Sequence, residues 1–239
     1  MAPTVFVTGG DRGLGFALCA GLLEQGWQVF AGQFMPEWPD LSHLAGQYSQ
    51  MLHIIPLDVS RVESVQAAAQ TVAALTDQVD VLINNAGIYA PIAGRPIREP
   101  QDYTEMHRLY DVNTLGPLRV VEAFLSLTDH VNLKRLCFVS SEAGSIARSE
   151  RTAWFGYCMS KAALNMGVKI LFNDLYPDGY TFRVYHPGWI RSYMSGEKNM
   201  EATLEPEEAA SQAIPIFLGQ QEDEGRLVLV DNEGKEWPW

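Results

Sequence analysis

Short apolar runs alternate along the chain with longer stretches in which apolar positions follow a helical period. Val81-Leu82-Ile83 and Leu227-Val228-Leu229 are continuous apolar runs, as expected of strands buried on both faces. The alternation predicts an α/β fold, with a doubly wound parallel sheet of about seven strands and helices on both faces. The predicted strands are Thr4–Thr8, Gln28–Ala31, Leu52–Leu57, Val79–Asn84, Arg135–Ser140, Phe182–His186 and Arg226–Val230, and the predicted helices are Leu14–Gln25, Val62–Leu75, Tyr103–Leu127, Tyr157–Tyr176 and Pro206–Leu218.

The segment Met35–Asp40 stands where the second crossover helix would ordinarily begin, and it contains two prolines and a tryptophan. This composition predicts a short or irregular crossover. With 239 residues and no stretch that resembles a linker, the chain is expected to form one domain over residues 1–239.

Acidic residues outnumber basic ones by 29 to 17, for a formal net charge of −12, which argues against partnership with nucleic acid or anionic membranes. The three cysteines and five histidines show no metal-ligand spacing, so no metal is assigned, and the cysteines suit a reducing compartment. The N-terminus lacks the features of a secretory signal, and no apolar run approaches the roughly 20 residues of a spanning helix. We therefore expect a soluble protein of the cytoplasm.

A glycine motif, Thr8–Gly15, lies between the first predicted strand and the first predicted helix. Gly9, Gly13 and Gly15 permit a tight turn and close approach of the backbone to a pyrophosphate. The N–H groups and dipole at the start of the helix favour that negative charge. The motif therefore predicts a dinucleotide site, with an ordinary glycine-rich turn as the alternative.

Tyr157 and Lys161 lie one helical turn apart, so both project from one face of a predicted helix. A nearby ammonium favours the ionised form of a phenol, which then becomes a usable proton donor and acceptor. Ser141 precedes the pair and offers a second hydrogen bond to a reacting oxygen. Together with the glycine motif, these residues indicate nicotinamide-dependent carbonyl and alcohol chemistry, whereas the spacing alone would also fit two unrelated surface residues.

The combination of Thr8–Gly15, Asn84–Gly87, Asn113, Ser141, Tyr157 with Lys161, and Pro187-Gly188 resembles the short-chain dehydrogenase/reductase family, whose fold is of the Rossmann type. Within that family, Ser140–Ile146, Lys161–Met166, His186–Ile190 and the ending Asp231–Trp239 are similar to the branch that contains C-factor and sniffer-type carbonyl reductases.

The resemblance implies four catalytic residues. Tyr157 would be the acid/base, and Ser141 would hydrogen-bond to the substrate oxygen. Lys161 would lower the pKa of the phenol and bind the nicotinamide ribose, and Asn113 would hold a water that links Lys161 to solvent. For Asn113 the alternative is an amide tolerated on a polar helix face.

The same resemblance implies the cofactor. The end of the second predicted strand, Gly32-Gln33-Phe34, lacks the acidic residue that binds the ribose of NAD, and Arg12 can bind a 2′-phosphate. NADP is therefore preferred, with NAD as the alternative. Asp58 would contact adenine or merely cap the next helix. The cofactor-binding candidates are Thr8, Gly9, Asp11, Arg12, Gly13, Leu14, Gly15, Gln33, Asp58, Val59, Asn85, Ala86, Gly87, Tyr157, Lys161, Pro187, Gly188, Trp189, Ile190 and Ser192.

Loops near residues 89–100, 142–155 and 189–204 flank these motifs and are expected to border the substrate site. Their side chains predict a mostly apolar, aromatic pocket for a small or medium carbonyl or alcohol substrate. For each side chain, simple packing or surface exposure is an equally good explanation. The substrate-contact candidates are Tyr89, Glu142, Trp154, Trp189 and Tyr193.

The sequence thus indicates an oxidoreductase that transfers a hydride between NADP(H) and a carbonyl or alcohol. The alternative is a nucleotide-binding signalling or regulatory protein of the C-factor type with little turnover. The predicted helices Tyr103–Leu127 and Tyr157–Tyr176 carry more apolar residues than one buried face needs. Because relatives commonly associate through these helices, we expect a homodimer or homotetramer.

Overall fold

One sheet runs through the centre of the computed structural model, which describes residues 2–90, 94–194 and 196–239. Its strand order is β3-β2-β1-β4-β5-β6-β7-β8, and every neighbouring pair is parallel except β7 with β8. This confirms the predicted doubly wound α/β fold, with one strand more than expected. The strands are β1 Thr4–Val7, β2 Gln28–Gln33, β3 Leu52–Pro56, β4 Val81–Asn84, β5 Arg135–Val139, β6 Thr181–His186, β7 Leu229–Asp231 and β8 Glu236–Trp237.

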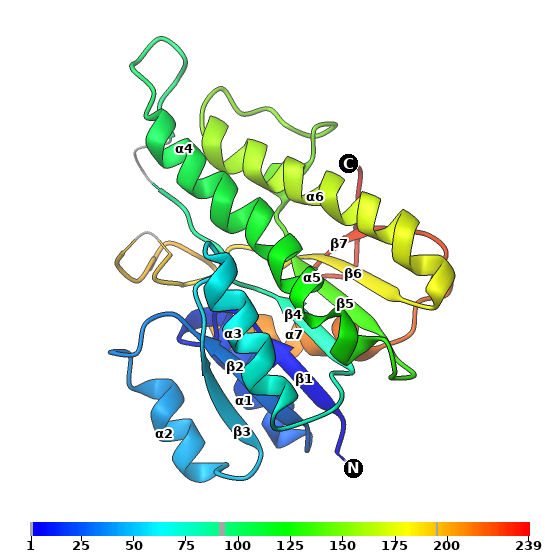
Figure 1. Cartoon of the computed structure of the whole chain (residues 1–239). Coiled ribbons are helices and arrows are strands. Elements are labelled where there is room, and N and C mark those ends of the chain that lie inside the picture. Colours follow the sequence, from blue (N-terminus) through cyan, green and yellow to red (C-terminus); the bar gives the residue numbers. More distant parts are fainter. Residues whose placement is uncertain (1, 91–93, 195) are drawn as a thin grey trace.

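Helices cover both faces of the sheet, with α3, α5 and α6 on one side and α1 and α7 on the other (Figure 1). Alternation along β1 shows why: Phe6 packs into the first core cluster, whereas Val5 and Val7 pack into the second. Both faces of each central strand must therefore be apolar. The helices are α1 Gly13–Glu24, α2 Asp40–Gln47, α3 Val62–Ala73, α4 Tyr103–Tyr110, α5 Gly116–Thr128, α6 Phe155–Leu175 and α7 Pro206–Leu218. The crossover α2 is short, as predicted.

The predicted helix Tyr103–Leu127 is helical throughout, but it is not one regular α-helix, because a π-helical turn, Asp111–Leu115, separates α4 from α5. Pro117 has no N–H with which to bond the carbonyl four residues earlier, so a regular α-helical ladder cannot pass this point. Instead, the N–H of Gly116 donates to the carbonyl of Asp111, which widens the turn. The prediction of one uninterrupted helix was wrong here.

The C-terminal strands also differ from expectation. The predicted strand Arg226–Val230 is β7 at Leu229–Asp231, and β8 was not predicted. The connection is a tight turn in which Gly234 adopts φ +78° and Asp231 accepts hydrogen bonds from the N–H groups of Glu233 and Lys235. Because β8 has only two residues, its sequence carries almost no strand period.

Candidate active site

Because the strands run parallel, the loops that follow them, and the sequence motifs on those loops, lie at one edge of the sheet. The glycine motif follows β1, Asn85–Gly87 follows β4, Ser140-Ser141 follows β5, and Pro187-Gly188 follows β6. In open α/β sheets, ligands bind at the carboxyl ends of the strands where the strand order reverses, which here is between β1 and β4. The predicted motifs are thus gathered at the expected edge.

Hydrogen bonds fasten the start of the glycine motif to the end of β4. The hydroxyl of Thr8 accepts from the N–H groups of Asn85 and Ala86, at 3.0 and 2.9 Å. In return, the amide of Asn85 donates to the carbonyls of Thr8 and Gly9, at 2.9 and 3.1 Å. The loop is therefore held in one shape before any ligand arrives.

The glycines of this loop fit a pyrophosphate. A Cβ on Gly15 would lie 1.9 Å from the carbonyl oxygen of Gly9, so only glycine allows this close approach. Gly9 and Gly13 adopt φ +66° and +57°, which favours glycine as well. No side chain caps the N-terminus of α1, so its first N–H groups remain for an anion.

The end of β2 is organised by Asp11, whose carboxylate accepts from the N–H groups of Phe34 and Met35 at 2.9 and 2.8 Å. Burial raises the pKa of Asp11, although these hydrogen bonds counter it. The buried side-chain amide nitrogen of Gln33 has no hydrogen-bond partner in the described part of the chain. A buried donor of this kind needs an acceptor, so it suits a ligand at this position.

Asp58 does not cap the following helix, because the N-cap residue of α3 is Arg61 and no side chain of the described residues bonds to the first N–H groups of that helix. The Asp58 carboxylate instead accepts from the N–H and hydroxyl of Ser60, at 2.9 and 2.6 Å, immediately before α3. The neighbouring Val59 is buried, and its carbonyl accepts from Arg119 at 3.2 Å. Contact of Asp58 with adenine stays a prediction.

Tyr157 and Lys161 lie in the first turns of α6, below the loop that carries Ser141. The hydroxyl of Ser141 accepts from the N–H of Ala143 at 3.1 Å and interacts with the phenol of Tyr157, which lowers the pKa of that phenol. The ammonium of Lys161 lies 5.9 Å from the centroid of the Tyr157 ring and donates to the carbonyl of Val139 at 3.0 Å. The three predicted side chains are therefore brought together.

Burial dominates the electrostatics of this group. It raises the pKa of Tyr157 to about 12, against a lowering contribution from the Ser141 hydrogen bond. It also lowers the pKa of Lys161 to about 8. We expected Lys161 to make the phenol more acidic; instead, removal from water outweighs nearby positive charge, and the phenol is protonated at neutral pH.

Asn113 occupies the π-helical turn and is fully buried, so it does not lie on a polar helix face. Its amide accepts from the N–H of Ile88 at 2.8 Å and donates to the carbonyl of Ile88 at 2.9 Å and to Ser160 at 3.1 Å. A Cβ on Gly87 would lie 3.3 Å from Asn113 Oδ1 and 3.6 Å from Lys161 Nζ. Asn113 and Lys161 thus approach the same point on the chain.

Aromatic rings stand beside the phenol. The ring of Tyr89 lies 5.6 Å from that of Tyr157, edge to face, and 5.1 Å from that of Trp154. Trp154 adopts φ +69° at the start of α6, a strained conformation that directs its indole towards Gly94. Of the predicted loop 89–100, residues 91–93 lie outside the described part of the chain.

The loop after β6 crosses back over the glycine motif. Gly188 adopts φ +77°, and Ile190 pairs with Leu204 in a parallel bridge, which closes the loop. The Cβ of Ser192 lies 3.7 Å from where a Cβ on Gly13 would stand. Trp189 is 53% exposed, so it is free to contact a ligand. Ser192 thus lies beside Gly13 of the glycine motif, and contact of Pro187, Ile190 and Ser192 with a cofactor stays a prediction.

Tyr193 lies away from the phenol. Its ring packs edge to face on Trp38 at 4.9 Å and lies 5.7 Å from the guanidinium of Arg12. This places the residue beside the glycine motif and the end of β2, although we expected it among the substrate contacts.

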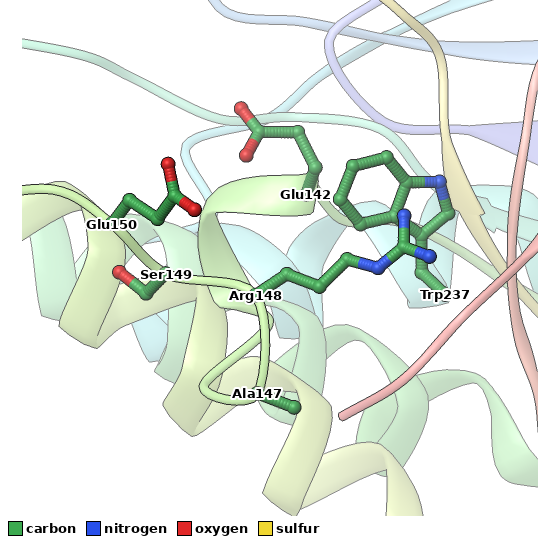
Figure 2. Close-up of a pocket in the computed structure, with 6 residues that line it drawn as sticks. All are labelled: Glu142, Ala147, Arg148, Ser149, Glu150 and Trp237. Atoms are coloured by element: carbon green, nitrogen blue, oxygen red, sulfur yellow. The ribbon is translucent and has the colours of Figure 1, made fainter.

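Beside Glu142, an open cavity of about 490 Å³ lies against the C-terminal segment (Figure 2). The guanidinium of Arg148 lies 4.7 Å from the ring of Trp237, and the N–H of Ala147 donates to the carbonyl of Trp239 at 3.0 Å. Glu142 pairs with Arg151 at 2.9 Å. We did not predict that Trp237 lines a cavity, because its only signal in the sequence is an aromatic ending. The cavity is lined by Glu142, Ala147, Arg148, Ser149, Glu150 and Trp237.

Within residues 2–90, 94–194 and 196–239, no group of three or more His, Cys, Asp or Glu side chains is placed to hold a metal ion. Of the helices in this described part, none combines the length and hydropathy needed to cross a membrane.

The family model for short chain dehydrogenases matches residues 3–203. The chain belongs to the short-chain dehydrogenase/reductase family of oxidoreductases. An uncharacterized oxidoreductase of Schizosaccharomyces pombe is 35% identical over 234 residues, which cover 95% of this chain and 89% of that protein. C-signal of Myxococcus xanthus is 38% identical over 165 residues, covering 69% of this chain and 95% of C-signal.

Solved structures of this family superpose over the whole chain. The carbonyl reductase Sniffer of D. melanogaster matches with a TM-score of 0.89 at 27% identity, covering 100% of both chains. A short-chain dehydrogenase/reductase from Burkholderia multivorans with bound NADP matches with a TM-score of 0.86 at 29% identity, also covering 100% of both chains. These likenesses confirm the family resemblance that the sequence motifs carried.

Proposed function

We propose that this protein is an NADP(H)-dependent carbonyl reductase or alcohol dehydrogenase acting on small or medium, mostly apolar substrates. One observation carries the proposal: the Tyr157 phenol, whose pKa Ser141 lowers and which lies beside the buried ammonium of Lys161, stands at the sheet edge that also carries the glycine loop. Such a group can give a proton to an oxygen on which negative charge develops.

The residues at the groove fit an NADP(H) cofactor, which supplies the hydride when bound. The N–H groups at the start of α1 would bind its pyrophosphate, and Lys161 and Ser192 would bind its ribose and carboxamide. β2 does not itself end in an acidic residue, the Asp11 carboxylate at this point is occupied by the N–H groups of Phe34 and Met35, and Arg12 offers a cation for the 2′-phosphate. The NADP-bound relative from Burkholderia multivorans supports the same preference.

In the reduction direction, Ser141 would hold the carbonyl oxygen and Tyr157 would give it a proton. The high pKa of the phenol, about 12, keeps that proton in place until charge develops on the substrate. The phenolate left behind would be stabilised by the Lys161 ammonium, whose field is strong in a site shielded from water. Asn113 would position a water through which a proton returns.

The substrate class follows from the aromatic rings. Tyr89 and Trp154 flank the phenol and offer apolar faces to a carbonyl compound. That Sniffer is a carbonyl reductase supports this choice. Glu142, tied to Arg151, would form a polar rim rather than pair with a charged substrate.

The test is a panel of ketones, aldehydes and alcohols with NADP(H) and NAD(H), followed by cofactor absorbance. Tyr157→Phe should lower turnover by about 10²–10⁴-fold while nucleotide affinity stays unchanged, because only the acid/base is removed. Tyr103→Phe, at an exposed position on α4, is the matched control. Wild-type protein inactive on every substrate, or a fully active Tyr157→Phe, would contradict the proposal.

The alternative, a regulatory protein of the C-factor type, draws on the likeness to C-signal. The organised set of Ser141, Tyr157 and Lys161 argues against it, since nucleotide sensing alone needs no acid/base.

Exposed Met159, Met166 and Ile170 form an apolar row on α6, and we propose that a second copy of the chain covers it in a homodimer or homotetramer.

A further inference from the structure

Three segments that are distant in sequence meet above the glycine motif. Arg12 comes from that motif, Trp38 from the loop between β2 and α2, and Tyr193 from the loop after β6. The guanidinium carbon of Arg12 lies 5.0 Å from the Trp38 ring centroid and 5.7 Å from that of Tyr193, and the two rings pack edge to face at 4.9 Å. We refer to these three residues as the aromatic clasp.

Among the residues that the structure describes, the charge of Arg12 is not neutralised and its N–H donors are not used by another side chain. In the described part of the chain, no carboxylate forms an ion pair with Arg12. The carboxylate of the adjacent Asp11 is engaged by the N–H groups of Phe34 and Met35. A guanidinium held on aromatic faces keeps its planar fork of N–H donors free, and that fork matches a phosphate.

The position of the aromatic clasp indicates which phosphate of the cofactor Arg12 would bind. Asp11, next to Arg12, is bonded to the end of β2, where a dinucleotide's adenosine ribose lies in this fold. The orphaned amide of Gln33 is at the same strand end. A cation and a neutral donor together, with the one nearby carboxylate, Asp11, already engaged by backbone N–H groups, suit a phosphate ester on the 2′ oxygen of that ribose.

We propose that Trp38 and Tyr193 are positioning residues that hold Arg12 ready for the 2′-phosphate, so that Tyr193 helps to determine selectivity for NADP(H) over NAD(H). The inference rests on the proposed NADP(H) dependence and deepens it. Because Tyr193 belongs to the loop 189–204, capture of the 2′-phosphate and placement of that loop are linked, and each must stabilise the other.

The test measures binding by calorimetry, without turnover. The full-length protein is titrated with adenosine 2′,5′-bisphosphate and, in parallel, with adenosine 5′-monophosphate, which lacks the 2′-phosphate. Trp38→Leu and Tyr193→Leu should each weaken binding of the bisphosphate by about 2–5-fold, the effect of losing one exposed cation–π contact, and leave the monophosphate unchanged. Tyr193→Phe keeps the ring and should bind like wild type, as should the control Tyr103→Leu on α4.

A double-mutant cycle isolates the role of Arg12. In an Arg12→Leu background, Tyr193→Leu should have no further effect on bisphosphate binding, since the residue that it positions is gone. Additive losses, or equal weakening of both nucleotides, would overturn the inference. Wild-type protein that binds neither nucleotide would instead overturn the proposed function, so the two failures are distinguishable.

Discussion

At the scale of single residues, burial decides how the candidate active site responds to pH. Lys161 is buried and Tyr157 is half-buried, and burial opposes the charged form of each. The phenol therefore keeps its proton across the physiological range, whereas the ammonium loses its proton within reach of mildly alkaline pH. Lys161 is the group whose titration should limit the reaction.

Reduction should decline as pH rises through about 8, where Lys161 loses its proton. The sign follows from the lowered pKa: the ammonium is present below that value and absent above it, and without it the Tyr157 phenolate is poorly stabilised. A pH profile of kcat measures this. Lys161→Arg, which stays protonated, should move the decline to higher pH at a reduced rate. Coincident profiles for the two proteins would exclude Lys161 as the titrating group.

Much of this residue-scale picture could be predicted. The four-residue spacing predicts that Tyr157 and Lys161 share a helix face, and the structure agrees. The direction of the Tyr157 pKa could not be predicted, because it depends on burial by segments distant in sequence. Likewise, nothing near Tyr193 in the sequence indicates that its ring packs against Trp38, which lies in the loop between β2 and α2.

At the scale of elements, the π-helical turn between α4 and α5 positions Asn113. The extra residue in this turn directs the amide at the backbone of Ile88, on the chain after β4. The sequence predicts a helix here correctly, but the break depends on Pro117, whose effect we did not anticipate. The missed strand β8 has a similar cause, since the turn that forms it is held by the Asp231 side chain.

Asn113→Leu should lower the free energy of unfolding by about 2–4 kcal/mol, because it leaves the buried N–H and carbonyl of Ile88 without partners. Urea unfolding followed by circular dichroism measures the loss. Asn113→Asp keeps the acceptor for the Ile88 N–H and should fall between Leu and wild type. Equal stability of all three proteins would show that the amide does not hold the loop.

At the scale of the whole molecule, two buried arginines join the sheet to α7. Arg135 on β5 donates to the carbonyls of Phe217 and Gly219 at 2.7 and 2.8 Å. Arg183, on the neighbouring β6, donates to Gly219 at 2.6 Å and to the carboxylate of Glu224 at 2.7 Å. These two strands and the end of α7 are thus fixed to one another at the edge of the sheet opposite the candidate active site.

Glu224 is the anion that compensates these cations. Burial alone would raise its pKa, but hydrogen bonds from Arg183 and Gln221 and the two positive charges outweigh burial and lower it. Glu224→Gln should cost about 2–3 kcal/mol of stability at neutral pH, less than for a fully buried pair because the carboxylate is 25% exposed.

Urea unfolding at several pH values checks this prediction, with Glu222→Gln, an exposed neighbour, as the control. Because the folded pKa is lowered, the stabilisation is present above the ordinary glutamate pKa of about 4.3 and is lost as pH falls through the folded value. The difference between Glu224→Gln and wild type should therefore shrink in acid. A gap that is constant with pH would rule out the charge as its origin.

The carbonyls of Pro238 and Trp239 accept hydrogen bonds from Ser145 and Ala147, and the ring of Trp237 packs against the guanidinium of Arg148. One wall of the cavity beside Glu142 is thus supplied by residues almost a hundred positions further along the chain. We therefore expect substitutions at Trp237, Pro238 and Trp239 to change substrate choice without altering Tyr157, Lys161 or the glycine motif.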